Sequence, residues 1–427
     1  MNVVTLLFGT FGLMLLLGAP ITLALGVASM SALYFLGNDL VYLVQVAYTS
    51  VDSFPIMALP AFILAGALME YAGISKRLVN VAEALAGPAT GGLASATVLA
   101  CLFFGAISGS GPATTAAVGM LMIPAMIRRN YDKGYASAIT ASSGGLGVVI
   151  PPSIPMVIYG VSGNQSIAKL FIAGFVPGIL IAGGLMVVNY HLCRKKGYTG
   201  SGHKWSVSTL GKAIKDGFWS LMAPVVILGG IYTGFFTPTE AAVVAIFYTL
   251  FVGIFIHREL RWDGCAKSLE ACTWLTGRVL LIMFTARAFG RLLVQYRIPE
   301  IIANALLAMT SNVYIILALI IAFLIFVGMF METLATIMIL TPVLLPVMVK
   351  LGVDPIHFGI ILVVCCEIGF ETPPLGENLF IASGIADTSI EDISLKAIPF
   401  SIVEISAVFL IAYVPAISLW LPGLLGY

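Results

Sequence analysis

The chain has 427 residues, of which 60% are hydrophobic and 10% charged, and its mean hydropathy is +1.06. This composition is typical of an integral membrane protein, and its apolar runs of helical length exclude a porin-type barrel, whose strands would alternate apolar and polar residues. The net charge of +1, without a basic block outside the loops, gives no sign of nucleic-acid binding.

The first apolar segments, within residues 3–71, are expected to form scaffold helices. Two of them are short for a full crossing, which needs about 20 residues, and they flank Ala19-Pro20. Corresponding segments of the second half flank Thr237-Pro238 in the same way. We therefore assign 221–296 to scaffold helices as well.

Residues 91–127 are apolar enough for one long span, but SGSGP at 108–112 interrupts their centre. Two half-helices of about 15 residues, each residue rising 1.5 Å, reach only about 22 Å, whereas the hydrocarbon core is about 30 Å thick. We therefore predict a re-entrant hairpin that enters the membrane halfway and returns.

The next segment, 135–160, is predicted to be a broken helix. Glycine removes helical preference, and proline deletes a backbone donor and clashes with the preceding turn. Both occur in the middle of this segment, at Gly144, Gly145, Gly147, Pro151, Pro152 and Pro155. A break at membrane depth must line a cavity or be buried in protein, because lipid cannot satisfy the freed backbone groups. A simple proline kink is the alternative.

The same plan occurs twice in the chain. GFETPP at 369–374 matches GVVIPP at 147–152 with an offset of 369 − 147 = 222, and GMFMET at 328–333 matches GAISGS at 105–110 with 328 − 105 = 223. Interrupted apolar segments in corresponding halves point to the binding site of a secondary transporter. We therefore predict an all-α polytopic membrane protein built as an inverted repeat, with two re-entrant helical hairpins and two broken helices.

The two repeats are expected at 1–193 and 219–427, joined by a cytoplasmic linker at 194–218. The second repeat carries the other hairpin at 314–349 and the other broken helix at 357–386. Cytoplasmic loops carry an excess of lysine and arginine, and this arrangement places most of the 21 basic residues inside. The same trace puts both termini outside.

Motifs of several enzyme chemistries are missing. The sequence contains no GxxxxGK[ST] phosphate loop, no HExxH and no GxSxG, and its 4 histidines are scattered. We expect no enzyme activity, and energy for transport would come from a gradient, a partner or the substrate itself.

Oxygen ligands for a hard cation gather at the breaks. Ser108, Ser110 and Thr372 carry hydroxyls beside glycine-rich interruptions whose carbonyls are freed. Such neutral oxygens suit sodium, whereas a proton relay would use titratable groups. The alternative is that these small residues serve helix packing. Main-chain oxygens could come from Gly147, Ile150, Pro152, Gly328, Gly369 and Leu375.

Charged side chains also lie in apolar segments near the second-half breaks. Intramembrane charges are costly and are usually paired or functional, so these residues either form Arg–Glu pairs between helices or contact an anionic substrate. Arg287 and Arg291, four apart, share one helical face. Both explanations stay open at this point. The residues are Glu332, Glu367, Glu371, Glu377, Arg278, Arg287 and Arg291.

Four motifs together carry a family resemblance. They are FGAISGS at 104–110, IPPS at 150–153, a Pro-x-x-x-x-Pro spacing within 52–66, and TPPLGENLF at 372–380. With them the chain resembles, over nearly its whole length, the large membrane (permease) subunit of a TRAP (tripartite ATP-independent periplasmic) transporter. The resemblance implies a multi-pass protein of the bacterial inner membrane, in the ion-transporter superfamily, that takes up an organic acid with sodium by an elevator movement.

The resemblance also implies ligands and partners. One sodium ion would lie at Ser108, Ser110, Gly147, Ile150 and Pro152, and another at Gly328, Gly369, Thr372 and Leu375. The implied partners are a small four-helix membrane subunit, a soluble periplasmic substrate-binding protein and the lipid bilayer, with no nucleic acid. The organic acid stays open between a C4-dicarboxylate, sialic acid and a 2-oxo acid.

Two other functions remain open from the sequence. One is a stand-alone divalent-anion/sodium symporter of related fold, which needs no binding protein. The other is a membrane scaffold or channel subunit that transports nothing alone. Because the sequence starts directly with the large-subunit pattern, we expect a version that is not fused to the small subunit.

Overall fold

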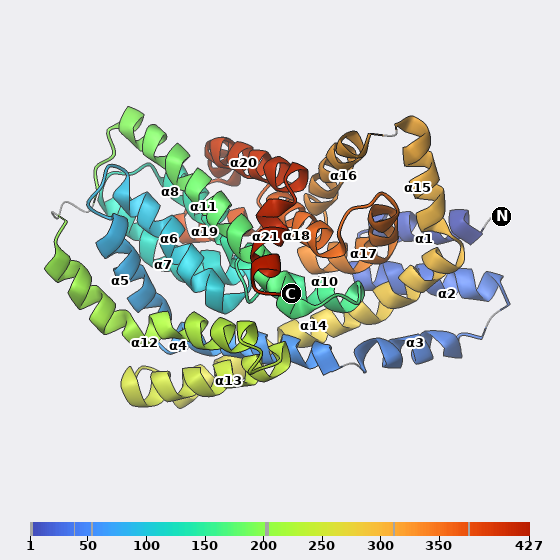
Figure 1. The fold of residues 1–427 in the computed structure, drawn as a ribbon, viewed down its shortest axis with the longest axis horizontal. Coiled ribbons are helices and arrows are strands. Elements are labelled where there is room, and N and C mark those ends of the chain that lie inside the picture. The colour runs from blue at the N-terminus through green and yellow to red at the C-terminus, as the bar shows by residue number, and fades with distance from the viewer. Residues whose placement is uncertain (1–2, 38, 53, 201–204, 311, 375) are drawn as a thin grey trace.

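The structure is a computed structural model that describes residues 3–37, 39–52, 54–200, 205–310, 312–374 and 376–427, with Ala47 described in its backbone alone. Throughout these ranges the chain forms helices and connecting turns, without a β-strand (Figure 1). Six of these helices are long and apolar enough to cross a membrane, or up to eight if each of two bent pairs counts as one span. The fold class expected from the sequence is confirmed.

The first repeat begins with scaffold helices and continues into the helices around the first break. Local capping explains several starts: Asp132 and Ser166 accept hydrogen bonds from the amides of Tyr135 and Lys169. The elements are α1 (Val3–Leu16), α2 (Ile21–Phe35), α3 (Val41–Val51), the 3-10 turn η1 (Phe54–Met57), α4 (Ala58–Tyr71), α5 (Ile74–Ala86), α6 (Gly92–Ser108), α7 (Gly111–Arg128), α8 (Lys133–Gly144), α9 (Leu146–Val149), α10 (Ile154–Ser162) and α11 (Ile167–Lys196).

The second repeat follows the same order. Thr237 and Glu240 form a capping box at the start of its second helix, each side chain bonding a backbone amide of the other's residue. The elements are α12 (Val207–Tyr232), α13 (Pro238–Phe251), the π-helical turn η2 (Val252–Ile256), α14 (Trp262–Gln295), α15 (Ile298–Met309), α16 (Val313–Gly328), α17 (Thr333–Lys350), α18 (Pro355–Phe370), α19 (Glu377–Ala386), α20 (Ile390–Tyr413) and α21 (Ala416–Leu424).

The first hairpin, formed by α6 and α7, turns at Gly109, whose φ of +63° suits a residue without a Cβ. Ser110 then caps α7 by accepting the amide of Ala113. In the broken helix that follows, the segment 133–149 and α10 are bent by 42° across a four-residue gap. Gaps between α16 and α17, and between α18 and α19, correspond in the second repeat.

Two features of the helices add to the plan expected from the sequence. Helix α11 extends into the polar stretch 194–218 as far as Lys196, and α12 begins within it at Val207. In the second half, a single continuous helix, α14, extends over 34 residues, about 51 Å at 1.5 Å per residue. Its counterpart is interrupted at η1, which contains Pro55, whereas α14 contains no proline.

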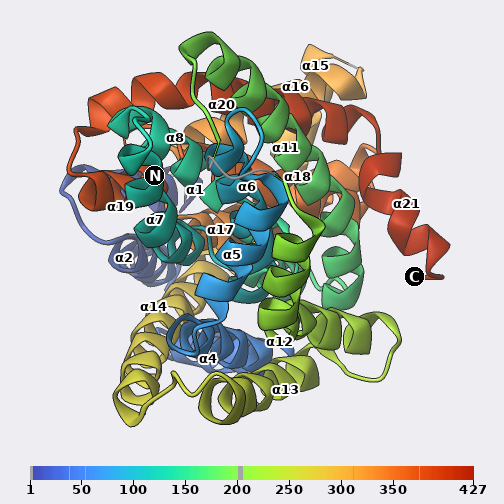
Figure 2. The ribbon, with the colours of Figure 1, turned by 90° about the vertical axis from the view of Figure 1, so that its left-hand side faces the viewer.

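The helices form two groups that meet where α14 contacts α17. α4 contacts α13 and α14, and α14 also contacts α2 and α3. These helices lie on one side of α6, α7, α8 and α17–α20 (Figures 1 and 2). Within the second group, α7 packs on α19 and α17 packs on α10, so the second arm of each hairpin contacts the broken helix of the other repeat. We call α6–α11 and α16–α20 the hairpin-bearing block.

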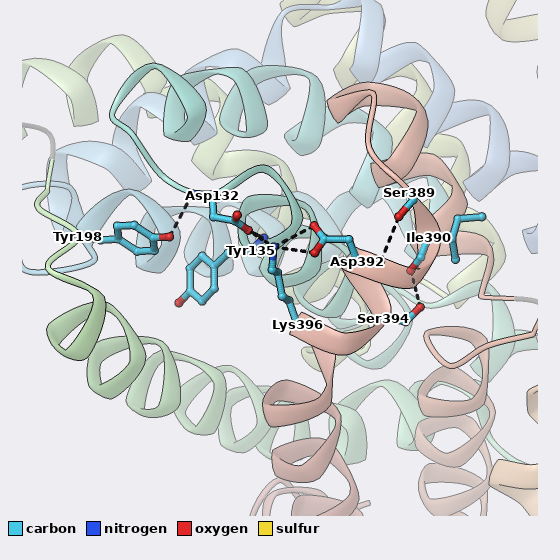
Figure 3. A network of polar contacts seen from close by, with 8 residues as sticks. All are labelled: Asp132, Tyr135, Tyr198, Ser389, Ile390, Asp392, Ser394 and Lys396. Carbon is cyan, nitrogen blue, oxygen red and sulfur yellow. Dashed lines mark hydrogen bonds and ion pairs between the residues drawn. The ribbon is translucent and has the colours of Figure 1, made fainter.

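A polar clamp ties the two repeats together at one end of this block (Figure 3). Lys396 of α20 forms ion pairs with Asp132, before α8, and with Asp392, 2.8 Å away one turn earlier. The Asp132 amide also donates to the Tyr198 hydroxyl at 3.1 Å. Burial raises the pKa of Asp132, but the hydrogen bond and the charge of Lys396 lower it by a larger amount. The pKa of Asp132 therefore lies below its usual value.

We expect Asp132→Asn to lower the melting temperature of the purified protein at neutral pH, since asparagine retains the cap of α8 and loses the ion pair. The pair is partly exposed, so the loss is about 0.5–1 kcal/mol. A lowered folded-state pKa contributes stability above the ordinary carboxyl pKa of about 3.9, which disappears as pH falls through the folded value. The difference between variant and wild type should therefore shrink in acid. Asp263→Asn, in an exposed i,i+4 pair with Lys267, serves as the control, and an equal effect there would contradict the clamp.

Candidate functional site

The first hairpin and the first broken helix meet through glycine. A Cβ added to Gly105 would lie 2.7 Å from the Gly147 Cα, and one added to Gly147 would lie 2.8 Å from the Ser110 carbonyl oxygen. At the hairpin tip, the hydroxyls of Ser108 and Thr114 are 2.8 Å apart, and Thr114 donates to the Ser110 carbonyl at 2.7 Å. Two hydroxyls and one carbonyl oxygen therefore lie beside the place where Gly105 of the hairpin meets Gly147 of the broken helix. We call this contact the first glycine crossing.

The break itself closes against the hairpin tip. The Ile154 amide donates to the Gly109 carbonyl at 3.1 Å, and a Cβ on Gly109 would lie 2.7 Å from the Pro152 carbonyl oxygen. Ser108, Ser110, Gly147 and Pro152 are thus brought together. Ile150 lies in the same break, where its amide donates to Leu146 and its side chain packs on Gly178 of α11.

The second crossing repeats this approach. A Cβ on Gly369 would lie 2.6 Å from both Cα and C of Gly328. Thr372 follows, and its hydroxyl donates to the Ile368 carbonyl at 2.7 Å, which leaves its oxygen lone pairs available as acceptors. Leu375, the remaining predicted ligand, lies outside the described residues.

A cavity of about 290 Å³ lies between the two hairpin tips. The starts of four helices border it: α7 at Gly111, α10 at Ile154, α17 at Thr333 and α19 at Glu377. The first turn of a helix lies at the positive end of the helix dipole, which acts at α10 even though its Ile154 and Met156 amides are already bonded to Gly109 and Ser153. Four such ends around one cavity, two from each repeat, suit a small anion.

The cavity also explains part of the charge pattern. Arg278 of α14 forms an ion pair with Glu332 at 2.9 Å, and both line the cavity with Glu367 and Glu377. This residue pair is therefore an Arg–Glu contact between helices, one of the two explanations left open by the sequence. Arg287 instead donates to the Val161 carbonyl at 2.8 Å, at the end of α10.

Several candidate residues were not found from the sequence. Thr114 adds a hydroxyl to the first crossing, and Thr333 has a buried hydroxyl without a hydrogen-bond partner among the described residues, beside the cavity. Asn378 donates to Glu367 at 3.0 Å. Glu404, in the apolar helix α20, is buried close to Glu371. Glu404 was detectable as a lone acid in an apolar run, whereas the threonines carry no distinguishing pattern.

Comparison with known proteins identifies the family. The family model described as "Tripartite ATP-independent periplasmic transporter, DctM component" matches residues 8–417. The chain belongs to this family of large TRAP permeases. The resemblance drawn from the sequence is thereby confirmed. Members of this family are multi-pass proteins of the inner membrane, and work with a small membrane subunit and a periplasmic binding protein.

Curated relatives cover this large permease almost completely. It is 46% identical over 98% of its length to an isethionate TRAP transporter permease protein, DctMQ, of Oleidesulfovibrio alaskensis, and spans 66% of that longer protein. It is 36% identical to the C4-dicarboxylate large permease DctM of Rhodobacter capsulatus, over 99% of each chain. It is also 36% identical to the sialic acid large permease SiaM of Vibrio cholerae, again over 99% of each chain.

Solved transporter structures share the fold. The Alcanivorax borkumensis YdaH transporter matches with a TM-score of 0.66 and 16% identity, covering 90% of this permease and 89% of YdaH. Neisseria gonorrhoeae MtrF matches with a TM-score of 0.61 and 14% identity, covering 89% and 84% of the two chains. At this level of identity the likeness concerns the fold alone.

The tight packing at the second glycine crossing can be tested by adding a methyl group to one of its glycines. Gly369→Ala places a Cβ against the Gly328 backbone, which cannot move aside as a flexible side chain could, so we expect a loss of about 1–3 kcal/mol from overpacking. A thermal unfolding assay on purified protein measures the effect. Gly384→Ala is the matched control, because that helical glycine has nothing within 4 Å of an added Cβ. Equal melting temperatures for both variants would mean that the crossing is not tightly packed.

Proposed function

We propose that this permease takes up a small organic acid together with sodium, as the large subunit of a TRAP transporter. The observation that carries the proposal is the convergence of four helix starts on one cavity between the hairpin tips. Helix N-termini favour negative charge, and a carboxylate or sulfonate is such a group. Arg278 adds one full positive charge to the cavity lining.

The cavity volume favours a small acid. Ligand pockets range over about 300–1,000 Å³, and about 290 Å³ lies just below that range. The relatives are named for isethionate, C4-dicarboxylates and sialic acid, and the isethionate permease is 46% identical to this chain. A two- to four-carbon acid therefore fits the cavity better than the nine-carbon sialic acid.

Two sodium positions are proposed at the glycine crossings. The first would use oxygens of Ser108, Ser110, Gly147, Ile150 and Pro152, and the second those of Gly328, Gly369, Thr372 and Leu375. Four of the first five come together around the hairpin tip, and Thr114 brings an additional hydroxyl there. Sodium binding beside the anion cavity would offset the charge of an organic acid, which is the electrostatic basis of coupling.

The elevator movement is also a proposal, supported by the separation of the helices into two groups. α14 runs along the hairpin-bearing block and contacts α17, where a Cβ on Gly290 would lie 3.0 Å from Pro342. A small-residue contact of this kind lets two helices approach closely. Sliding of the block along α14 would expose the cavity alternately to the two sides. The small four-helix subunit would bind the scaffold, and the periplasmic binding protein would deliver the acid.

The test is uptake into proteoliposomes containing the permease and its small subunit. We expect labelled isethionate or succinate to accumulate under an inward sodium gradient when a cognate binding protein is added, and not under an equal potassium gradient. N-acetylneuraminate is the larger comparison acid. Uptake without a binding protein would favour a stand-alone symporter, and no uptake of any of the three acids would favour a non-transporting subunit.

The second sodium position is tested by Thr372→Val, which keeps the shape of the side chain and removes its hydroxyl. Loss of one oxygen ligand should weaken sodium binding by about 1–2 kcal/mol, by analogy with a lost hydrogen-bonding group. The sodium concentration for half-maximal uptake should then rise several-fold. Thr372→Ser, which retains the hydroxyl, is the matched control. An unchanged sodium dependence in folded Thr372→Val protein would remove Thr372 from the site.

A further inference from the structure

Arg278 occupies a distinctive place in the anion cavity. It belongs to α14, which packs on α2, α3 and α4 as well as on α17, whereas most other lining residues belong to the hairpin-bearing block. Among the described residues that line the cavity it is the one basic side chain, and three acids accompany it: Glu332, Glu367 and Glu377. An entering anion therefore meets a single guanidinium and several groups of its own sign.

The partner of Arg278 lies at the tip of the second hairpin. Glu332 precedes α17 in the capping position, yet its side chain makes no capping hydrogen bond. It pairs with Arg278 across the cavity instead, at 2.9 Å. The residue in the capping position of the first hairpin's second arm, Ser110, does cap its own helix by accepting from Ala113. The two tips are thus built differently, and only the second reaches α14 through an ion pair.

This arrangement leaves binding groups available around the pair. The side chain of Arg278 is 57% exposed and that of Glu332 only 16%, so the guanidinium is the accessible partner. A guanidinium carries five N–H donors in a planar fork that matches a carboxylate. Because Glu332 does not cap α17, the first amides of that helix need another acceptor. The buried Thr333 hydroxyl beside them also lacks a hydrogen-bond partner in the described part of the chain.

We propose that Arg278 is the residue that selects anionic substrates, and that Glu332 occupies it as an internal stand-in for the substrate carboxylate. This inference rests on the proposed function, uptake of an organic acid. An arriving carboxylate or sulfonate takes the place of Glu332 on the guanidinium, while its remaining oxygens accept from Thr333 and the start of α17. In the empty permease the one basic side chain among the described lining residues is neutralised by Glu332, so Glu332 and the substrate compete for Arg278.

If Glu332 and the substrate compete for Arg278, substitutions of the two ion-pair residues should change the KM in opposite directions. Glu332→Gln removes the competitor, so we expect the KM for whichever of succinate or isethionate is transported to fall about three- to tenfold. Arg278→Gln removes the selecting group, so KM should rise at least tenfold. Arg278→Lys, which keeps the charge without the fork, should lie between wild type and Arg278→Gln. Wild type should be inhibited more strongly by the acid than by a neutral analogue, which is succinamide for succinate or ethylene glycol for isethionate. Among these variants, we expect this preference for the acid to decrease only in Arg278→Gln.

Measurements use the complete reconstituted transporter, with KM and maximal rate determined separately and the amount of folded protein quantified. Arg77→Gln is the matched control, because Arg77 forms an ion pair of the same 2.9 Å length with Glu259 and does not line the cavity; its KM should equal that of wild type. A purely structural Arg278–Glu332 contact would lower folded protein or maximal rate in both variants and leave KM unchanged. That result, or a KM that shifts in the same direction in both, would overturn the assignment. Absence of transport of every tested acid by wild type would instead refute the proposed function.

Discussion

The structure depends on one constraint, which is that backbone polar groups inside a membrane must find partners within the protein. Each repeat interrupts an apolar helix, and in the first repeat the hairpin tip supplies a partner at the break, because the Ile154 amide bonds to the Gly109 carbonyl. Each hairpin must bring its backbone close to the backbone of the broken helix. Glycine therefore faces glycine at both crossings, with Gly105 against Gly147 and Gly328 against Gly369. The cavity is a consequence of this arrangement, since the starts of four helices border one space.

Electrostatics then determines what that space can hold. The helix starts and Arg278 favour an anion, while the acids Glu332, Glu367 and Glu377 oppose it. Because the cavity is lined by positive and negative groups, a cation bound beside it would change the electrostatic energy of a bound anion. Anion occupancy would then depend on cation occupancy. At the first crossing, Gly109 and Ser110 also line the cavity, so the proposed coupling would act over a short distance there.

The two repeats are similar in order and unequal in detail. The scaffold helix is interrupted in the first half at Pro55 and continuous in the second, so that only α14 extends along the block for 34 residues. The tips differ in the same sense, with Ser110 bonded to its own helix and Glu332 bonded to α14. An inverted repeat with identical halves would contact its scaffold equally on both sides; this one has a single charged contact between α14 and a hairpin tip among the described residues.

The sequence alone determined the repeat, the positions of the breaks and the family, because glycine and proline act through local backbone geometry that any reader of the chain can recognise. Recurrence of the motifs at nearly constant offset also located most of the proposed sodium ligands. Only the tertiary structure showed that Arg278 pairs with Glu332 while Arg287 bonds to a carbonyl, and that Thr114 and Thr333 face the site. These facts depend on which faces of distant helices meet. Periodicity places Arg287 and Arg291 on one face of a helix, but the partner opposite that face is set by packing between residues more than a hundred positions apart.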